Sequence, residues 1–322
     1  MEHRSYMRRR AGPSTYAAIL LLLVFTISSG ASQYDGSTEE RNISVIETIP
    51  HDSEAFTQGL ELHNGSLVES TGLYGHSGLR KVDPYDGRVI DETTINESFF
   101  GEGLTIVGES VIMLTWRSEI ALVFDSGDLS ETGSLSFEGE GWGLCFDGEY
   151  LVMSNGTSEL AFRDPDSFEV SHRISVTWDG NPVSWLNELE CVDGLIYANV
   201  WLQDVILAIN SSSGDVAFFA SASFLSENQG ETTNEVLNGI AYDRSREGFW
   251  ITGKNWTEMY LVSIDPQVSS PDSENVGNIG YKAELSEYWQ AFAFLLIVLL
   301  AALIHRKMPN FKDPPIGEGN GD

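Results

Sequence analysis

Five short segments of the chain begin with a side chain that could take part in chemistry. Their first residues recur roughly every 40 to 50 positions, at Gln58, Glu102, Trp142, Glu188 and Asn238, and four of the five are followed by glycine. A carboxylate can move protons, a carboxamide can hydrogen-bond, and an indole can exclude water. Because burying such groups without partners is costly, their recurrence at one repeat position indicates a small-ligand site.

Three more residues fit the same site. Trp116 and Trp201 end runs of strand composition and could wall the pocket. Lys254 is one of only about eleven basic residues left once the two chain ends are set aside. For each tryptophan taken alone, a place in the core is the simpler interpretation. For the whole set, a pocket explains the pattern better.

The elements that position these residues are predicted to be short strands. Runs such as residues 111–116 and 196–201 are rich in β-branched and aromatic residues and have no helical period. A repeat of 40 to 50 residues with about four such strands is typical of a propeller blade. We therefore predict an all-β fold, a five-bladed β-propeller over residues 42–265. Residues 43–49 are left over and are expected to complete the last blade and close the ring.

This fold would bring the candidate residues together. The innermost strands of a propeller line its central channel. The first residues of the five repeats should then meet at one mouth of that channel.

The two ends of the chain have the composition of targeting segments. Residues 1–31 hold arginines, an apolar run and small residues in the order of a signal peptide. Residues 288–304 form an apolar, uncharged stretch with Tyr288 and Trp289 at one end and basic residues after it, which favours a C-terminal transmembrane helix over the alternative of a buried core helix. Residues 266–287 would be a stalk and 305–322 a cytoplasmic tail. The expected location is membrane-anchored, with the propeller on the extracytoplasmic side.

The charge and the cysteines exclude several classes of protein. With 48 acidic against 18 basic residues, the net charge is −30, which repels phosphate backbones and excludes nucleic-acid binding. The acidity suits a solvated surface in salty surroundings better than a specific cation site. Cys145 and Cys191 hold the same repeat position in neighbouring blades, so they form either a disulfide or two buried thiols. The six histidines lack metal-ligand spacing, which argues against a catalytic zinc.

Several motifs together resemble the plant and bacterial type of glutaminyl-peptide cyclotransferase. The resemblance covers nearly the whole predicted propeller, in order and at compatible spacing. The motifs are Pro50-His51-Asp52, Ala55-Phe56-Thr57-Gln58-Gly59-Leu60, Glu69-Ser70-Thr71-Gly72-Leu73-Tyr74-Gly75, Phe100-Gly101-Glu102-Gly103-Leu104-Thr105, Leu114-Thr115-Trp116, Gly141-Trp142-Gly143-Leu144, Leu186-Asn187-Glu188-Leu189-Glu190, Asn199-Val200-Trp201 and Leu237-Asn238-Gly239-Ile240-Ala241. The family is a five-bladed propeller that cyclises N-terminal glutamine to pyroglutamate and releases ammonia.

The resemblance implies roles for the candidate residues. Glu102 would shuttle the proton from the attacking amine to the leaving ammonia, and Lys254 would stabilise the oxyanion or tune Glu102. Trp116 and Trp142 would desolvate Glu102. Asn187 is counted with Glu102 and Lys254 as a catalytic residue and would hydrogen-bond the substrate. The remaining residues would bind or enclose the substrate: Gln58, Glu188 and Asn238 by polar contacts, and Phe56, Phe100 and Trp201 as walls. The alternative for Glu102 is a channel carboxylate that pairs with Lys254 without chemistry.

The expected partners and cofactors follow from the same resemblance. The substrate would be a peptide or protein with N-terminal glutamine, the membrane would be contacted by the C-terminal helix, and the protein would act as a monomer. No cofactor is required; a calcium ion can occupy a propeller channel, although no loop has calcium-ligand spacing. The main rival is a non-catalytic, membrane-anchored propeller that binds peptides or glycans. A quinone-dependent propeller would need a basic cluster that the sequence lacks.

Overall fold

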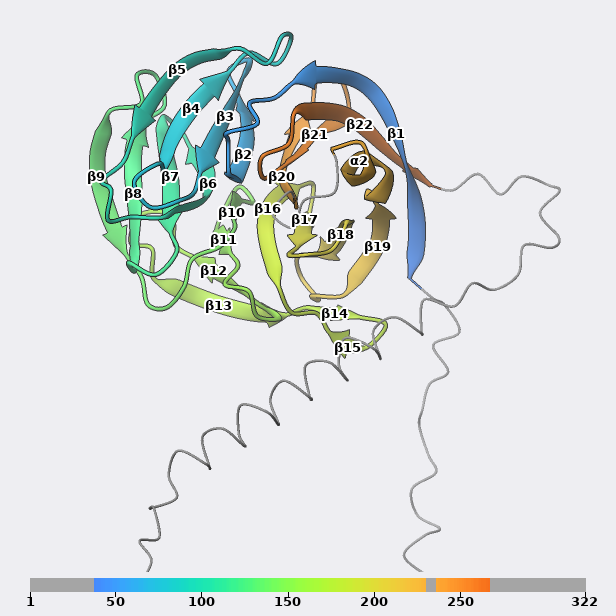
Figure 1. Ribbon diagram of the computed structural model, residues 1–322. Helices are drawn as coiled ribbons and strands as arrows, with labels where there is room; N and C mark the ends of the chain where they lie inside the picture. The colour runs from blue at the N-terminus through green and yellow to red at the C-terminus, as the bar shows by residue number, and fades with distance from the viewer. Residues whose placement is uncertain (1–37, 230–235, 267–322) are drawn as a thin grey trace, which may run out of the picture. The chain divides into compact units, whose positions relative to one another are not determined.

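The computed structural model describes residues 38–229 and 236–266, which form strands and one short helix (Figure 1). Most of the strands fall into five antiparallel units of four, here called blades. Blade 1 holds β2 (Thr57–His63), β3 (Ser66–Thr71), β4 (Gly78–Val82) and β5 (Val89–Thr94), and blade 2 holds β6 (Gly101–Val107), β7 (Ser110–Thr115), β8 (Ile120–Asp125) and β9 (Glu131–Ser136). Blade 3 holds β10 (Leu144–Phe146), β11 (Leu151–Met153), β12 (Glu159–Arg163) and β13 (Val170–Ser175), and blade 4 holds β16 (Leu186–Val192), β17 (Leu195–Val200), β18 (Val205–Asn210) and β19 (Val216–Ser221). Blade 5 holds β20 (Leu237–Asp243), β21 (Gly248–Gly253), β22 (Glu258–Pro266) and β1 (Glu39–Pro50); the hairpin β14 (Thr177–Trp178) and β15 (Asn181–Pro182) and the helix α2 (Ser223–Glu227) lie outside the blades.

The first strand of each blade lies on the inside of the ring. β2 contacts β6 and β20, β10 contacts β6 and β16, and β16 contacts β20, so the five inner strands close on themselves. These inner strands are almost entirely buried, whereas the outer strands β5 and β9 are mostly exposed. The burial gradient follows composition, because the inner strands carry glycine and aliphatic residues and the outer strands carry charges and hydroxyls.

Hydrophobic clusters between neighbouring blades hold the ring together. The cluster between blades 1 and 2 includes Leu79 and Leu104, and the one between blades 5 and 1 includes Leu60 and Trp250. Three further clusters join the remaining pairs. The core is thus divided among the interfaces, as expected when each blade can bury its faces only against its neighbours.

The N-terminal strand closes the ring, as the sequence predicted. β1 pairs antiparallel with β22 from Arg41 to Pro50 and parallel with β19 from Glu39 to Arg41. It therefore completes blade 5 and also joins blade 5 to blade 4, which makes one eight-stranded sheet (Figure 1).

The predicted fold class needs correction. The chain is all-β, but it is organised as one eight-stranded sheet, three four-stranded sheets and a small hairpin. Among residues 38–229 and 236–266, no helix is long and apolar enough to cross a membrane, so the corrected fold class of the described structure is all-β without a transmembrane helix. The apolar stretch 288–304 lies outside the described residues, as do the predicted leader, the cytoplasmic tail and the stalk beyond Pro266.

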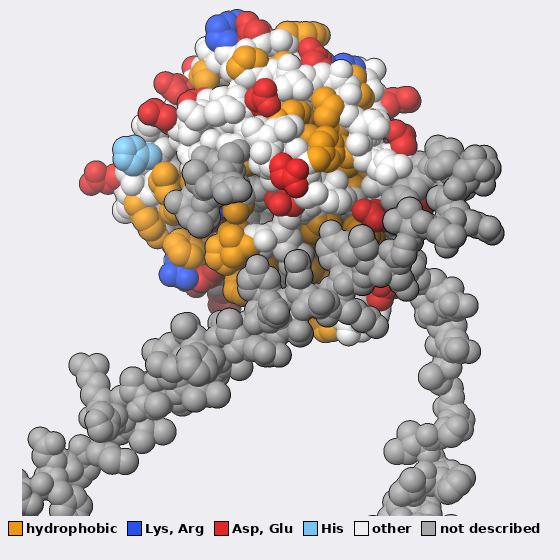
Figure 2. Space-filling model, turned by 45° about the vertical axis from the view of Figure 1, so that its right-hand side comes forward, with side chains coloured by type: hydrophobic (Ala, Val, Ile, Leu, Met, Phe, Trp, Pro, Cys, Tyr) orange, Lys and Arg blue, Asp and Glu red, His pale blue; other side chains and the backbone are white. Residues whose placement is uncertain are grey.

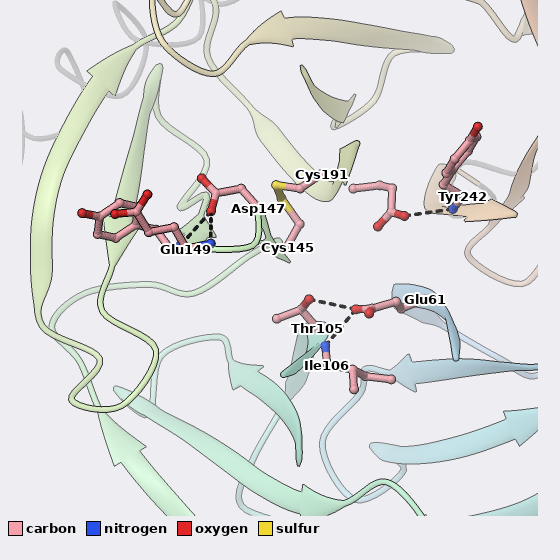
Figure 3. Close-up of a disulfide and its surroundings, with 10 residues drawn as sticks. Glu61, Thr105, Ile106, Cys145, Asp147, Glu149, Cys191 and Tyr242 are labelled. Carbon is pink, nitrogen blue, oxygen red and sulfur yellow. Dashed lines mark hydrogen bonds between the residues drawn. A yellow bond between two sulfur atoms is a disulfide. The ribbon is translucent and has the colours of Figure 1, made fainter. Parts of the chain in front are cut away.

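A disulfide ties blade 3 to blade 4. Cys145 on β10 and Cys191 on β16 are bonded, with their Cα atoms 5.5 Å apart (Figure 3). Of the two alternatives that the sequence leaves open for these cysteines, the structure adopts the bridge.

Candidate active site

Irregularities in four of the inner strands occur at the candidate residues. The pairing register shifts across Gln58 in β2, across Glu102 in β6, across Asn187 in β16 and across Asn238 in β20. Such bulges turn side chains out of the regular alternation and are common next to active sites. In blade 3 the equivalent residue, Trp142, lies just before the short strand β10.

The fourth repeat is shifted by one residue from the alignment that the sequence favoured. Within the bulge between Leu186 and Leu189, Asn187 and not Glu188 holds the position equivalent to Glu102. Glu188 stands where the other blades have glycine. A Cβ at one of these glycines, Gly143, would lie 1.9 Å from the Asn187 carbonyl oxygen, so most inner strands need glycine here to approach one another.

Glu188 is consequently engaged inside the channel and not at the mouth. Its carboxylate accepts hydrogen bonds from the backbone N–H of Leu60 (3.3 Å) and of Ile240 (2.9 Å). It ties blades 1, 4 and 5 together from within. Glu188 was predicted to touch the substrate, but both of its carboxylate oxygens already accept hydrogen bonds from the backbone.

Glu102 and Lys254 form the charged centre of the site. Both are buried, at 6% and 5% exposure, and they do not form a salt bridge with each other. Burial raises the pKa of Glu102 well above its ordinary value; the Lys254 charge opposes this rise and the Glu140 charge adds to it. Burial lowers the pKa of Lys254, and Glu102 opposes that change. A buried carboxyl with a raised pKa is suited to both accepting and donating a proton near neutral pH.

Glu140 is a member of the site that the sequence analysis missed. One of its oxygens accepts hydrogen bonds from the indole N–H of Trp116 (2.9 Å) and of Trp142 (3.1 Å). The other oxygen accepts from Arg117 Nε (2.8 Å), and the Arg117 guanidinium lies 3.7 Å from the centre of the Trp116 ring. Glu140 thereby fixes two of the predicted aromatic walls. Its place two residues before Trp142 was the only available signal.

The predicted aromatic residues gather around the charged centre in two groups. Phe100 contacts Phe56 (ring centroids 6.2 Å apart) and Trp116 (5.6 Å). Across blades 3 and 4, Trp142 contacts Trp201 at 5.9 Å. All five rings are partly buried, whereas Glu102 and Lys254 are buried, so the rings lie nearer the surface than the two charged groups. Lys254 Nζ lies 5.0 Å from the centre of the Phe56 ring, which links the first group to the charged centre.

The carboxamides of the site differ in their hydrogen bonding. Some groups hold neighbouring residues in place, and others have no hydrogen-bond partner among the described residues. Asn238 Nδ2 donates to the carbonyl oxygens of Thr57 (3.0 Å) and Gln58 (3.3 Å) and to Gln58 Oε1 (3.4 Å), so it holds the segment that bears Gln58. The Oδ1 atoms of Asn187 and Asn238 are buried without a donor among the described residues. Because an unpaired buried acceptor is unfavourable, these oxygens are suited to a ligand donor.

A buried ionic network also holds the segment that bears Gln58. Glu69 on β3 accepts from Arg80 Nε (2.7 Å) and Thr57 Oγ1 (2.5 Å) and contacts His51 Nε2 (2.9 Å). His51 Nδ1 in turn contacts the carbonyl oxygen of Trp256 in blade 5 (2.8 Å). The Arg80 and His51 charges hold the pKa of Glu69 well below its ordinary value despite burial. The network thus joins blades 5 and 1 next to Gln58, through the neighbouring residue Thr57.

Three carboxylates lie within the channel. Besides Glu188, Glu61 accepts from Thr105 Oγ1 (2.8 Å) and the Ile106 N–H (2.9 Å), and Glu190 accepts from the Tyr242 N–H (2.9 Å) (Figure 3). Burial raises the pKa of Glu61 to about 7 and the pKa of the other two well above the ordinary value, and repulsion from a neighbouring carboxylate adds to the rise for Glu188 and Glu190. Within residues 38–229 and 236–266, no three His, Cys, Asp or Glu side chains are grouped so that they could hold a metal ion.

The comparisons with known proteins agree with this geometry. The family described as glutamine cyclotransferase matches residues 18–264. A glutaminyl-peptide cyclotransferase from Arabidopsis thaliana is 37% identical over 241 residues, which cover 73% of this chain and 75% of the relative. The crystal structure of Myxococcus xanthus glutaminyl cyclase superposes with a TM-score of 0.68 at 33% identity and covers 72% of this chain and 100% of that one. The chain therefore belongs to the glutamine cyclotransferase family.

Proposed function

We propose that this protein is a glutaminyl-peptide cyclotransferase that converts N-terminal glutamine of peptides or proteins to pyroglutamate and releases ammonia. The observation that carries the proposal is the buried Glu102 beside Lys254, without a salt bridge between them, under aromatic walls. The family membership and the names of the Arabidopsis and Myxococcus relatives support the same activity.

The pocket would enclose the glutamine side chain and the first peptide group. The chain of glutamine would lie between the two aromatic groups, where its methylene carbons and the cyclising ring are shielded from water. The carboxamides of Gln58 and Asn187 would hydrogen-bond the side-chain amide or the first peptide group. Holding the α-amine against the γ-amide carbon makes the reaction unimolecular and supplies a large part of the rate.

Glu102 would move the proton that the reaction must transfer. The neutral α-amine attacks the carbonyl carbon of the γ-carboxamide, a new C–N bond forms, and the carbonyl oxygen gains negative charge. Glu102 takes the proton that the amine nitrogen loses and passes it to the departing nitrogen, which leaves as ammonia when the old C–N bond breaks. Lys254 would stabilise the oxyanion, and its charge also keeps the pKa of Glu102 from rising further.

We further propose that the enzyme is exported. The leader-like composition of residues 1–31 and the disulfide between Cys145 and Cys191 support a non-reducing, extracytoplasmic location. Detection of the protein outside the cytoplasm, with the disulfide formed, would test this.

Ammonia release from a glutamine-initiated dipeptide by the purified full chain tests the activity. The wild type should turn over and Glu102→Gln should not. Absence of turnover by the folded wild type at both low and high salt would favour the rival function, a propeller that only binds peptides or glycans.

A further inference from the structure

One exposed tryptophan extends the aromatic wall of the site outward. Trp185, in the segment before β16, contacts Trp142 (ring centroids 6.2 Å apart) and Trp201 (5.4 Å). We call these three the tryptophan trio. Trp142 and Trp201 are partly buried, but Trp185 is 50% exposed. An indole exposed at the edge of a ligand pocket is an apolar surface available to the ligand.

The backbone holds Trp185 in this exposed position. Its φ of 69° is uncommon for a residue other than glycine. Its N–H donates to the Gly156 carbonyl oxygen (2.8 Å), and its own carbonyl oxygen accepts from the Trp201 N–H (2.8 Å). Both backbone groups are therefore satisfied by neighbouring segments, and the indole is presented in a fixed place. Fixed aromatic surfaces bind ligands at low entropic cost.

The position of Asn187 indicates the direction in which the rest of a bound peptide would extend from the pocket. This residue lies two positions after Trp185, and its Oδ1 is buried without a donor among the described residues. In the proposed function, Asn187 can hydrogen-bond the first peptide group of the substrate. If it does, the second residue of the substrate lies on the blade 4 side of the mouth, next to the tryptophan trio.

We propose that Trp185 is a specificity-determining residue, which binds the side chain of the second residue of the substrate and favours aromatic and large apolar side chains there. The inference rests on the proposed function and deepens it. The opposite edge of the mouth offers a competing surface, because Tyr74 is 53% exposed and contacts Phe100 at 5.5 Å. The structure favours Trp185, because it contacts two of the predicted wall residues and lies two positions from Asn187, whereas Tyr74 contacts one, Phe100.

The test compares kcat/KM for Gln-Phe amide and Gln-Ala amide. For the wild-type full chain we expect a ratio of about five to ten in favour of Gln-Phe amide, the size of an aromatic contact. Trp185→Ala should bring this ratio to about one, mainly through a higher KM for Gln-Phe amide. Trp185→Phe should keep most of the preference. Tyr74→Ala is the matched control on the opposite edge and should leave the ratio as in the wild type.

The outcomes separate this inference from the proposed function. Turnover of both substrates with an unchanged ratio in Trp185→Ala would overturn the role of Trp185. Loss of the preference in Tyr74→Ala instead would place the second residue on the other edge and would also overturn it. No turnover of either dipeptide by folded wild type would refute the proposed function, and this inference with it.

Discussion

At the scale of single residues, the proposed chemistry depends on Glu102 and its neighbours. Replacing Glu102 by Gln removes the proton shuttle but keeps the size and hydrogen-bonding capacity of the side chain. We expect kcat to fall by about 100-fold or more, the usual contribution of a general acid–base. Ammonia release measures the loss. An unchanged melting temperature would show that the fold is intact, and retained turnover would assign the proton transfer to another group.

The two charged neighbours of Glu102 should shift the pH profile in opposite directions. Lys254 lowers the pKa of Glu102 and Glu140 raises it. The acidic limb of kcat/KM should therefore move to higher pH in Lys254→Met and to lower pH in Glu140→Gln. The shift is measured from kcat/KM of each variant across the pH range. The substrate amine ionises in the same way in every experiment, so it does not contribute to the differences. Shifts in the same direction would contradict the assignment of Glu102 to this limb.

At the scale of elements, the joint between blades 5 and 1 depends on the Glu69 network. Because Glu69 accepts hydrogen bonds from Arg80 and Thr57 and contacts His51, Glu69→Gln leaves the buried Arg80 with only the more exposed Asp52 as its carboxylate partner among the described residues. We expect a loss of about 3 kcal/mol in the free energy of unfolding, measured by urea denaturation. Glu131→Gln on the exposed strand β9 is the control and should change stability little.

The same network has a defined pH dependence. The pKa of Glu69 is lower in the folded than in the unfolded state, so its stabilisation is present above the ordinary carboxyl pKa and is lost as pH falls. The difference between wild type and Glu69→Gln should shrink in acid. A constant difference down to pH 3 would mean that the carboxylate charge is not what stabilises the joint.

The sequence could predict the repeat but not its local irregularities. Glycine and aliphatic periodicity located the inner strands, and the unmatched segment 43–49 predicted the closure by β1. The alignment of Glu188 with Glu102 was wrong because bulges shift the register by amounts that no local pattern encodes. Glu140 and Trp185 were missed for a related reason. They reach the site from segments between strands, where their partners are distant in sequence.

At the scale of the whole molecule, two sets of acidic residues act differently. Acidic side chains are scattered over the face shown in Figure 2, in keeping with the net charge of −30. These surface charges repel one another and are screened by salt. Of the channel carboxylates, Glu188 is buried and Glu61 and Glu190 are partly buried, so added salt should affect them less than the exposed charges.

The channel carboxylates should make the protein less stable as pH rises. Their folded-state pKa values are raised, so the stability they contribute in the neutral form is present below the ordinary carboxyl pKa and is lost as pH rises, through about 7 for Glu61. We expect the melting temperature to fall by roughly 5 °C between pH 5 and pH 8, at high salt to suppress surface repulsion. The double variant Glu61→Gln/Glu190→Gln should flatten this dependence. An equally steep fall in the double variant would point to other groups.

The closure by β1 also sets the order in which the ring can be completed during synthesis. β1 leaves the ribosome first, but its partner β22 is made after all the other strands. Until then, β1 lacks its main pairing partner, and blade 5 has only its two inner strands, β20 and β21. A nascent chain that ends before β22 exposes open strand edges, which are prone to pair with other chains. Because β1 can complete blade 5 only after β22 has been made, premature termination before β22 should yield an aggregation-prone product and not a four-bladed enzyme.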